Sequence, residues 1–198
     1  MTDLNDVFSS YSDIYTQTFI VRPNEIDGEL CVTLTEGDKG ATLKTLKIRN
    51  VPKRTILLPL HQYSELSVGS KLKEIFNDEP GIFTCCDYVL VTINKDNLYY
   101  IFIEMKSYQP HNYDIKKQFK GATCFIGYSN AIIEHFYGIT SLKSISLNMR
   151  YHLVYQGRYN KRATKWERYK CHSSPDNFYP HGVEKNKDVS IPFGEFLL

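Results

Sequence analysis

The stretch CCDYVLVTINKDNLYYIFIEMKS, residues 85–107, decides the fold of this chain. Residues 85–93 and 98–105 are rich in β-branched and aromatic side chains, and the segment Asn94-Lys95-Asp96-Asn97 between them is typical of a turn. We therefore expect a β-hairpin that folds about the centre of this turn. In that register Asp87 faces Glu104, with Cβ atoms about 5 Å apart. Lys106 lies on the same face, because strand side chains alternate.

The predicted pairing of Asp87 with Glu104 indicates a metal site. Two carboxylates held so close repel each other and raise each other's pKa, and a cation between them relieves the conflict. Oxygen ligands suit Mg²⁺ or Mn²⁺, and a lysine beside the metal can orient a bound water or help to deprotonate it. This assembly suits hydrolysis of a phosphodiester. The alternative is a surface hairpin with a solvated Glu-Lys pair, but Glu104 and Lys106 interrupt a run that otherwise looks buried.

Asp87, the hairpin and Glu104-Met105-Lys106 resemble the motif of the PD-(D/E)XK nuclease superfamily, which includes many restriction endonucleases, Holliday-junction resolvases and RecB-type nuclease domains. Cys86 stands where the family often has proline. The resemblance implies that Asp87, Glu104 and the carbonyl of Met105 bind Mg²⁺ or Mn²⁺ and that Lys106 is catalytic. It also implies an α/β fold with a restriction-endonuclease-like core of order αβββαβ, in which helices flank a mixed central sheet.

A long helix is expected after the hairpin, from Asp114 as its N-cap to about residue 136. Its apolar stripe is Ile115, Phe119, Ala122, Ile126 and Ile133. The resemblance makes Gln118 a candidate active-site residue, because RecB-like members carry a glutamine early in this helix; an ordinary exposed glutamine is the alternative. The tyrosine that usually follows four residues later is absent, since position 122 is alanine. Lys116 and Lys120 are candidate phosphate contacts, although lysines at this spacing commonly form a solvated helix face.

Another helix is expected before the hairpin, over residues 61–77. Many members of the family place a further glutamate on such a helix, near the metal or its waters. Glu65 is the preferred candidate because it lies among uncharged residues, whereas Glu74 lies beside two lysines. It is equally open that neither glutamate touches the metal.

The net charge of +2 is unevenly distributed. Residues 1–40 hold eight acidic residues against Arg22 and Lys39, whereas residues 150–170 are basic and rich in tyrosine. The basic window suits nucleic acid, because cations follow phosphates and aromatic rings stack on bases. Its alternative is a protein interface, which favours the same residue types. The candidate nucleic-acid contacts in this window are Arg158, Lys161, Arg162, Lys165 and Arg168.

The 198 residues, 42% of them hydrophobic, are expected to form one domain. Its parts are an N-terminal β-rich extension (1–60), the core (61–156) and an irregular tail (157–198), in which one short closing strand is possible. Strands are expected near residues 28–35, 41–49, 55–60 and 144–156, with the early strands as an added layer. There is no run of about 18 apolar residues and no signal peptide, so we expect no membrane contact and a cytoplasmic location. The five cysteines favour reduced thiols, and Cys171, His172 and His181 form only part of a zinc-ligand set.

The sequence therefore predicts a metal-dependent nuclease that acts on DNA, in a setting such as bacterial or phage defence or repair, as a homo-oligomer or within a larger complex. The alternative is a non-catalytic subunit that keeps the nuclease fold and binds nucleic acid or protein. A site without catalytic activity has no physical need to keep two like charges close together, because their repulsion destabilises the fold. The intact set of Asp87, Glu104 and Lys106 therefore favours the enzyme.

Overall fold

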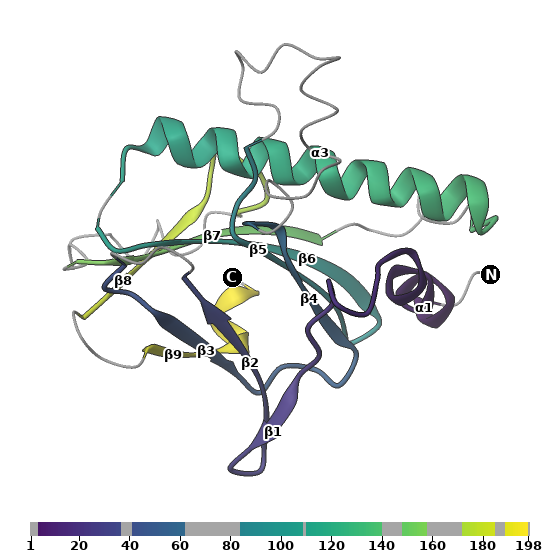
Figure 1. Cartoon of the computed structure of the whole chain (residues 1–198), viewed down its shortest axis with the longest axis horizontal. Coiled ribbons are helices and arrows are strands. Elements are labelled where there is room, and N and C mark those ends of the chain that lie inside the picture. The colour runs from purple at the N-terminus through teal and green to yellow at the C-terminus, as the bar shows by residue number, and fades with distance from the viewer. Residues whose placement is uncertain are drawn as a thin grey trace.

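The computed structural model describes residues 4–36, 41–61, 84–108, 110–139, 148–157, 172–184 and 189–197. The elements in chain order are α1 (Leu4–Ile14), β1 (Asn24–Ile26), β2 (Glu29–Thr35), β3 (Thr45–Arg49), β4 (Thr55–Pro59), β5 (Tyr88–Asn94), β6 (Asn97–Lys106), α3 (Asn112–Phe136), β7 (Asn148–Gln156), β8 (Tyr179–Val183), β9 (Val189–Pro192) and the 3₁₀ helix η4 (Phe193–Phe196). The chain is α/β, and α3 lies along one face of a sheet whose other face is covered by β2, β3 and β9 (Figure 1).

The central sheet has five strands in the order β4-β5-β6-β7-β8. The first three are antiparallel, whereas β7 runs parallel to β6 and β8 runs parallel to β7. The tight turn at Lys95 and Asp96, with φ angles of 47° and 59°, reverses the chain between β5 and β6. After β6 the chain returns through α3, which explains the parallel pairing of β7. The sheet is therefore mixed, as expected.

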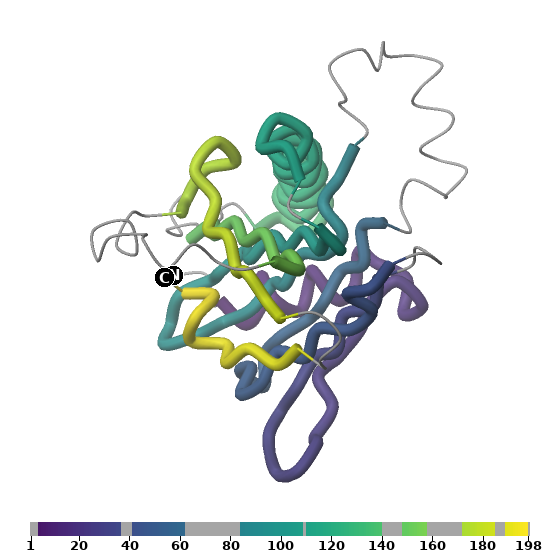
Figure 2. The backbone as a smooth tube through the Cα atoms, turned by 90° about the vertical axis from the view of Figure 1, so that its left-hand side faces the viewer, coloured from purple at the N-terminus to yellow at the C-terminus, as the bar shows by residue number. Residues whose placement is uncertain are grey.

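A second sheet has the order β1-β2-β3-β9. The β1–β2 hairpin turns at Asp27 and Gly28, whose φ angles of 55° and 79° suit a two-residue turn, and it projects away from the rest of this sheet (Figure 1, Figure 2). The C-terminal strand β9 pairs in parallel with β3. The added β layer is therefore built from both ends of the chain.

Two hydrophobic cores hold the layers together. The first lies between the helices and the central sheet, where Tyr11 of α1 and Phe119 of α3 pack with Phe102 of β6. The second lies between the two sheets and includes Ile48, Ile103 and other apolar residues of their facing strands. Because both faces of the central sheet are covered, the residues of β5 are buried from Tyr88 to Ile93. A polar side chain on these strands consequently needs a partner or a function.

Several expectations about the elements need correction. The long helix begins at Asn112, and its N-cap is His111, so Asp114 lies in the first turn instead, where its charge still favours the helix dipole. Strand β4 belongs to the central sheet, not to an N-terminal extension, because it pairs along its whole length with β5. The segment expected to be an irregular tail contains β8 and β9, one in each sheet. The helix expected over residues 61–77 lies outside the described residues, except for His61.

Candidate active site

Asp87 and Glu104 lie opposite each other, as the hairpin register predicted. Tyr88 pairs with Ile103, so the preceding residue, Asp87, comes to lie beside Glu104 in the next position of the ladder. Lys106 is the last residue of β6. The predicted register is confirmed along all seven pairs of the hairpin.

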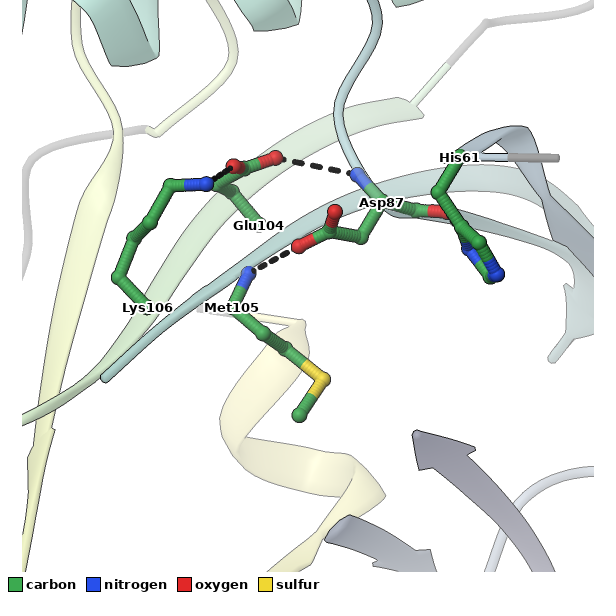
Figure 3. A network of polar contacts seen from close by, with 5 residues as sticks. All are labelled: His61, Asp87, Glu104, Met105 and Lys106. Carbon is green, nitrogen blue, oxygen red and sulfur yellow. Dashed lines mark hydrogen bonds and ion pairs between the residues drawn. The ribbon is translucent and has the colours of Figure 1, made fainter. Parts of the chain in front are cut away.

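The three side chains lie on the face of the sheet that α3 covers. The even-numbered residues of β6, such as Tyr100 and Phe102, belong to the core beneath the helices, and Glu104 and Lys106 continue that alternation. Met105 has the opposite orientation, and its side chain is buried in the core between the sheets. Figure 3 shows it pointing away from the two carboxylates, so only its backbone borders the site.

Each carboxylate is held by the backbone of the opposite strand (Figure 3). The Asp87 N–H donates to Glu104 Oε2 at 3.0 Å, and the Met105 N–H donates to Asp87 Oδ2 at 2.7 Å. Backbone amides are rigid donors, and they favour the ionised form of a carboxylate. The two acids are therefore fixed in position, and Oδ1 of Asp87 accepts no hydrogen bond from any described residue.

Lys106 supplies a cation, and its ammonium group forms an ion pair with Glu104 Oε1. The Glu104 side chain is fully buried, whereas that of Lys106 is 26% exposed. The ion pair therefore lies at the boundary between the protein interior and the solvent.

Burial and the mutual repulsion of the acids dominate the electrostatics. The pKa of Glu104 is raised to about 8: burial raises it most and the charge of Asp87 also raises it, whereas Lys106 and the Asp87 N–H act against the rise. Burial also raises the pKa of Asp87, against the charge of Lys106, the Met105 N–H and the charge of His61. For Lys106, burial lowers the pKa, but the charges of Glu104 and Asp87 outweigh it, so the net shift is upward. The site has two acids and one close cation, and it can accept a further positive charge.

The oxygen ligands that could hold such a cation are the carboxylates of Asp87 and Glu104 and the backbone carbonyl of Met105. Within the described part of the chain, no group of three or more His, Cys, Asp or Glu side chains is arranged to hold a metal ion. A site with two carboxylates suits Mg²⁺ or Mn²⁺, which keep several waters in their shell, better than Zn²⁺, which takes three or four protein ligands.

His61 also borders the site, and the sequence did not predict this. It follows β4, its N–H donates to the Asp87 carbonyl at 3.3 Å, and its Nδ1 lies 3.4 Å from the same oxygen. Its ring packs edge-on against Tyr88, with centroids 5.1 Å apart. His61 therefore anchors the backbone of Asp87 to the end of the neighbouring strand.

Among the predicted helix residues, Gln118 contributes through its backbone. Its carbonyl accepts a hydrogen bond of 3.1 Å from the Cys86 N–H, which ties α3 to the residue before Asp87. The predicted phosphate contacts Lys116 and Lys120 both approach Asp176, with Nζ–Oδ1 distances of 3.8 and 3.1 Å. These lysines are therefore ion-paired in the structure as it stands.

Other predicted site residues lie outside the described residues, and so does Cys171 of the partial zinc set. They are Glu65, Arg158, Lys161, Arg162, Lys165 and Arg168.

His181 pairs with another histidine. Its Nε2 lies 2.9 Å from Nδ1 of His152, whose Nε2 lies 3.0 Å from the Phe196 carbonyl. Because a carbonyl only accepts, His152 donates to Phe196 and accepts from His181, so the His152 ring is neutral. Burial lowers the pKa of both, that of His181 to about 3.

No family model, curated protein or solved structure matches this chain. The helices in the described part of the chain include none with the length and apolar character needed to cross a membrane.

Proposed function

We propose that this protein is a metal-dependent nuclease of the PD-(D/E)XK superfamily that hydrolyses phosphodiester bonds in DNA. The observation that carries the proposal is the arrangement of Asp87, Glu104 and Lys106. Two buried or half-buried acids are locked side by side by backbone amides, with one lysine beside them. Two acids held this close repel each other and destabilise the fold, so the arrangement is unfavourable for a purely structural cluster. A divalent cation bound between them would relieve the repulsion.

The element order supports the proposal. When the strands β1, β2 and β3 of the second sheet are left out, helix α1, the antiparallel strands β4, β5 and β6, helix α3 and the parallel strand β7 have the order αβββαβ. The carboxylates lie where β6 ends and α3 is about to begin, at the carboxyl edge of the parallel strands β6 and β7. Ligand sites in α/β sheets commonly lie outside this edge.

In the proposed mechanism, Asp87 and Glu104 would hold Mg²⁺ or Mn²⁺, and the bound ion would supply Lewis acidity for the hydrolysis. The raised pKa of Lys106 keeps its ammonium protonated at neutral pH. This ammonium would orient the water by donating a hydrogen bond and would offset the negative charge that grows on the phosphate.

A cleavage assay tests the function. Supercoiled plasmid, linear duplex, single-stranded DNA and RNA of matching sequence are incubated with the protein in Mg²⁺, in Mn²⁺ and in EDTA. We expect cleavage that needs the metal and falls at least about 100-fold in Glu104→Gln and Lys106→Met, as for loss of a group that stabilises the transition state. The matched control is Lys53→Met, an exposed lysine before β4, at the end of the sheet far from the site.

Cleavage that persists in EDTA, or at wild-type rate in both site variants, would contradict the proposal. If nucleic acid binds but no substrate is cleaved in either metal, the protein is the non-catalytic subunit instead.

A further inference from the structure

A pocket of about 310 Å³ lies next to the candidate active site, and the mechanism above does not use it. It is bordered by the start of α3, the end of β7 and the segment before β8. Its lining residues are Pro110, Asn112, Lys116, Leu153, Tyr155, Asp176, Asn177, Phe178 and Pro180. Its volume falls at the lower end of the range for small-molecule sites, about 300–1,000 Å³.

The register of β6 and β7 places this pocket beside the catalytic side chains. Glu104 pairs with Leu153 and Lys106 pairs with Tyr155 in the parallel ladder. Paired residues of neighbouring strands point to the same face and lie about 4.8 Å apart across the ladder. Leu153 and Tyr155 belong to the core beneath the helices, so the floor of the pocket adjoins Glu104 and Lys106 on the face under α3.

The lining suits a flat, neutral ring with polar edges. Tyr155 and Phe178 offer aromatic surface, and Pro110 and Pro180 offer apolar walls. The amides of Asn112 and Asn177 can each donate and accept hydrogen bonds, as the edge of a nucleobase requires.

A phosphate group fits this pocket poorly. Lys116 is the lining cation, and its ammonium lies 3.8 Å from the Asp176 carboxylate, which is itself in the lining and would repel an anion. Lys120 also pairs with Asp176, at 3.1 Å. The balance of charge therefore favours a neutral base over a phosphate.

Two exposed tyrosines lie close in sequence to the site. Tyr108 follows Lys106 by two residues, Tyr113 adjoins Asn112 in the first turn of α3, and both rings are 68% exposed. Lys117 lies over the Tyr113 ring, with its ammonium 4.5 Å from the centroid. Exposed rings with a neighbouring cation are the platforms on which unpaired bases stack, whereas the bases of an intact duplex are already stacked on each other.

We infer that the pocket receives one unstacked nucleobase of the strand to be cut, so that the substrate is DNA that is unpaired at the cleavage position. This inference rests on the proposed nuclease function, because it assigns the base next to the phosphate held at Asp87 and Glu104. A base held there places that phosphate on the Lys106 side of the pocket.

The first experiment measures binding without catalysis. Fluorescence anisotropy in EDTA compares a labelled single-stranded oligonucleotide, an oligonucleotide of equal length in which every nucleotide is abasic, and a matched duplex. Because the two single strands carry equal phosphate charge, the difference between their affinities measures the contribution of the bases. We expect the strand with bases to bind wild type at least about 5-fold more tightly than the abasic strand, the lower end of what stacking of one base contributes.

The variant Asn112→Trp fills the mouth of the pocket from an exposed helix position, and His135→Trp adds the same ring at an exposed position in the last turn of α3. We expect Asn112→Trp to lose the preference for bases and His135→Trp to keep it. The comparison of the two strands on wild type needs no variant, so equal binding of the two strands overturns the inference even if Asn112→Trp does not fold.

The second experiment measures Mg²⁺-dependent cleavage of single-stranded DNA and of the matched duplex. If duplex is cut as fast as single strand, or abasic and normal strands bind alike, the pocket assignment is overturned while the nuclease stands. If the preference for bases is present and lost in Asn112→Trp but nothing is cut, the pocket binds bases as inferred and the nuclease proposal fails.

Discussion

Replacing Glu104 by glutamine is the sharpest quantitative test of the site's electrostatics, because the change removes a titrating group and keeps the shape of the side chain. In the folded protein the pKa of Glu104 rises from its ordinary value of 4.5 to about 8. Between these two pH values the folded chain keeps a proton that the unfolded chain has released. The free energy of unfolding therefore falls as the pH rises through this range, and the loss is complete above about pH 8.

The size of the effect follows from the same two values. Each pKa unit corresponds to about 1.4 kcal/mol, so ionised Glu104 lowers the free energy of unfolding by about 5 kcal/mol at pH 8 relative to pH 4.5. The pKa of Asp87 is also raised, which acts in the same direction. The lowered pKa values of His152 and His181 act in the opposite direction at acid pH. The difference between wild type and Glu104→Gln removes the contributions of the two histidines, which both proteins share.

Urea unfolding in EDTA between pH 4.5 and 9 measures this difference. We expect Glu104→Gln to gain stability relative to wild type as the pH rises, by up to about 5 kcal/mol, with a plateau above about pH 8. The control is Glu25→Gln, an exposed carboxyl in β1. Added Mg²⁺ should stabilise wild type more than the variant. A difference that does not change with pH, or that changes with the opposite sign, would refute the reasoning.

Two further predictions concern cations and histidines. Lys106→Met should lower the free energy of unfolding by about 3 kcal/mol in metal-free buffer at pH 9, where Glu104 is ionised; this is the low end of the range for breaking a buried pair, because Lys106 is partly exposed and Glu104 is fully buried. Urea unfolding equal to that of Lys53→Met would contradict it. His181→Gln keeps a donor for His152 and removes a group whose pKa is lowered to about 3, so wild type should lose stability more steeply than the variant as the pH falls from 6.5 to 4. Parallel acid-unfolding curves would rule this out.

The hairpin could be predicted to the residue because its determinants are local. A two-residue turn fixes the register of the two strands that it joins, and this register places Asp87 opposite Glu104. The stripe of α3 was predictable for the same reason, since Ile115, Phe119 and Ile126 recur at helical spacing and are buried.

The pairing of distant segments could not be predicted from local pattern. Nothing in the residues of β9 indicates that it pairs with β3, because the two strands are separated by more than a hundred residues along the chain. The position of β4 depends likewise on β5, which follows it only after a long connection. Helix α1 was missed although it carries a signal, since Leu4, Val7, Phe8 and Tyr11 recur at helical spacing.

The residues of the site could be predicted from the sequence, but the contacts that hold them in place could not. Alternation along β6 separates Glu104 and Lys106 from Met105. The anchoring of Asp87 by His61 depends on how β4 pairs with β5. The pocket beside Lys106 requires α3, β7 and the segment before β8 to meet at one place, which no single stretch of sequence specifies.

The most direct test of the account is a calorimetric titration of the metal-free protein with Mn²⁺ at pH 7. The account predicts one divalent-cation site in wild type and in Glu25→Gln, and loss of binding in both Asp87→Asn and Glu104→Gln, because the two carboxylates share the ion. Unchanged Mn²⁺ binding in both site variants would contradict the claim that this pair of acids is a metal site.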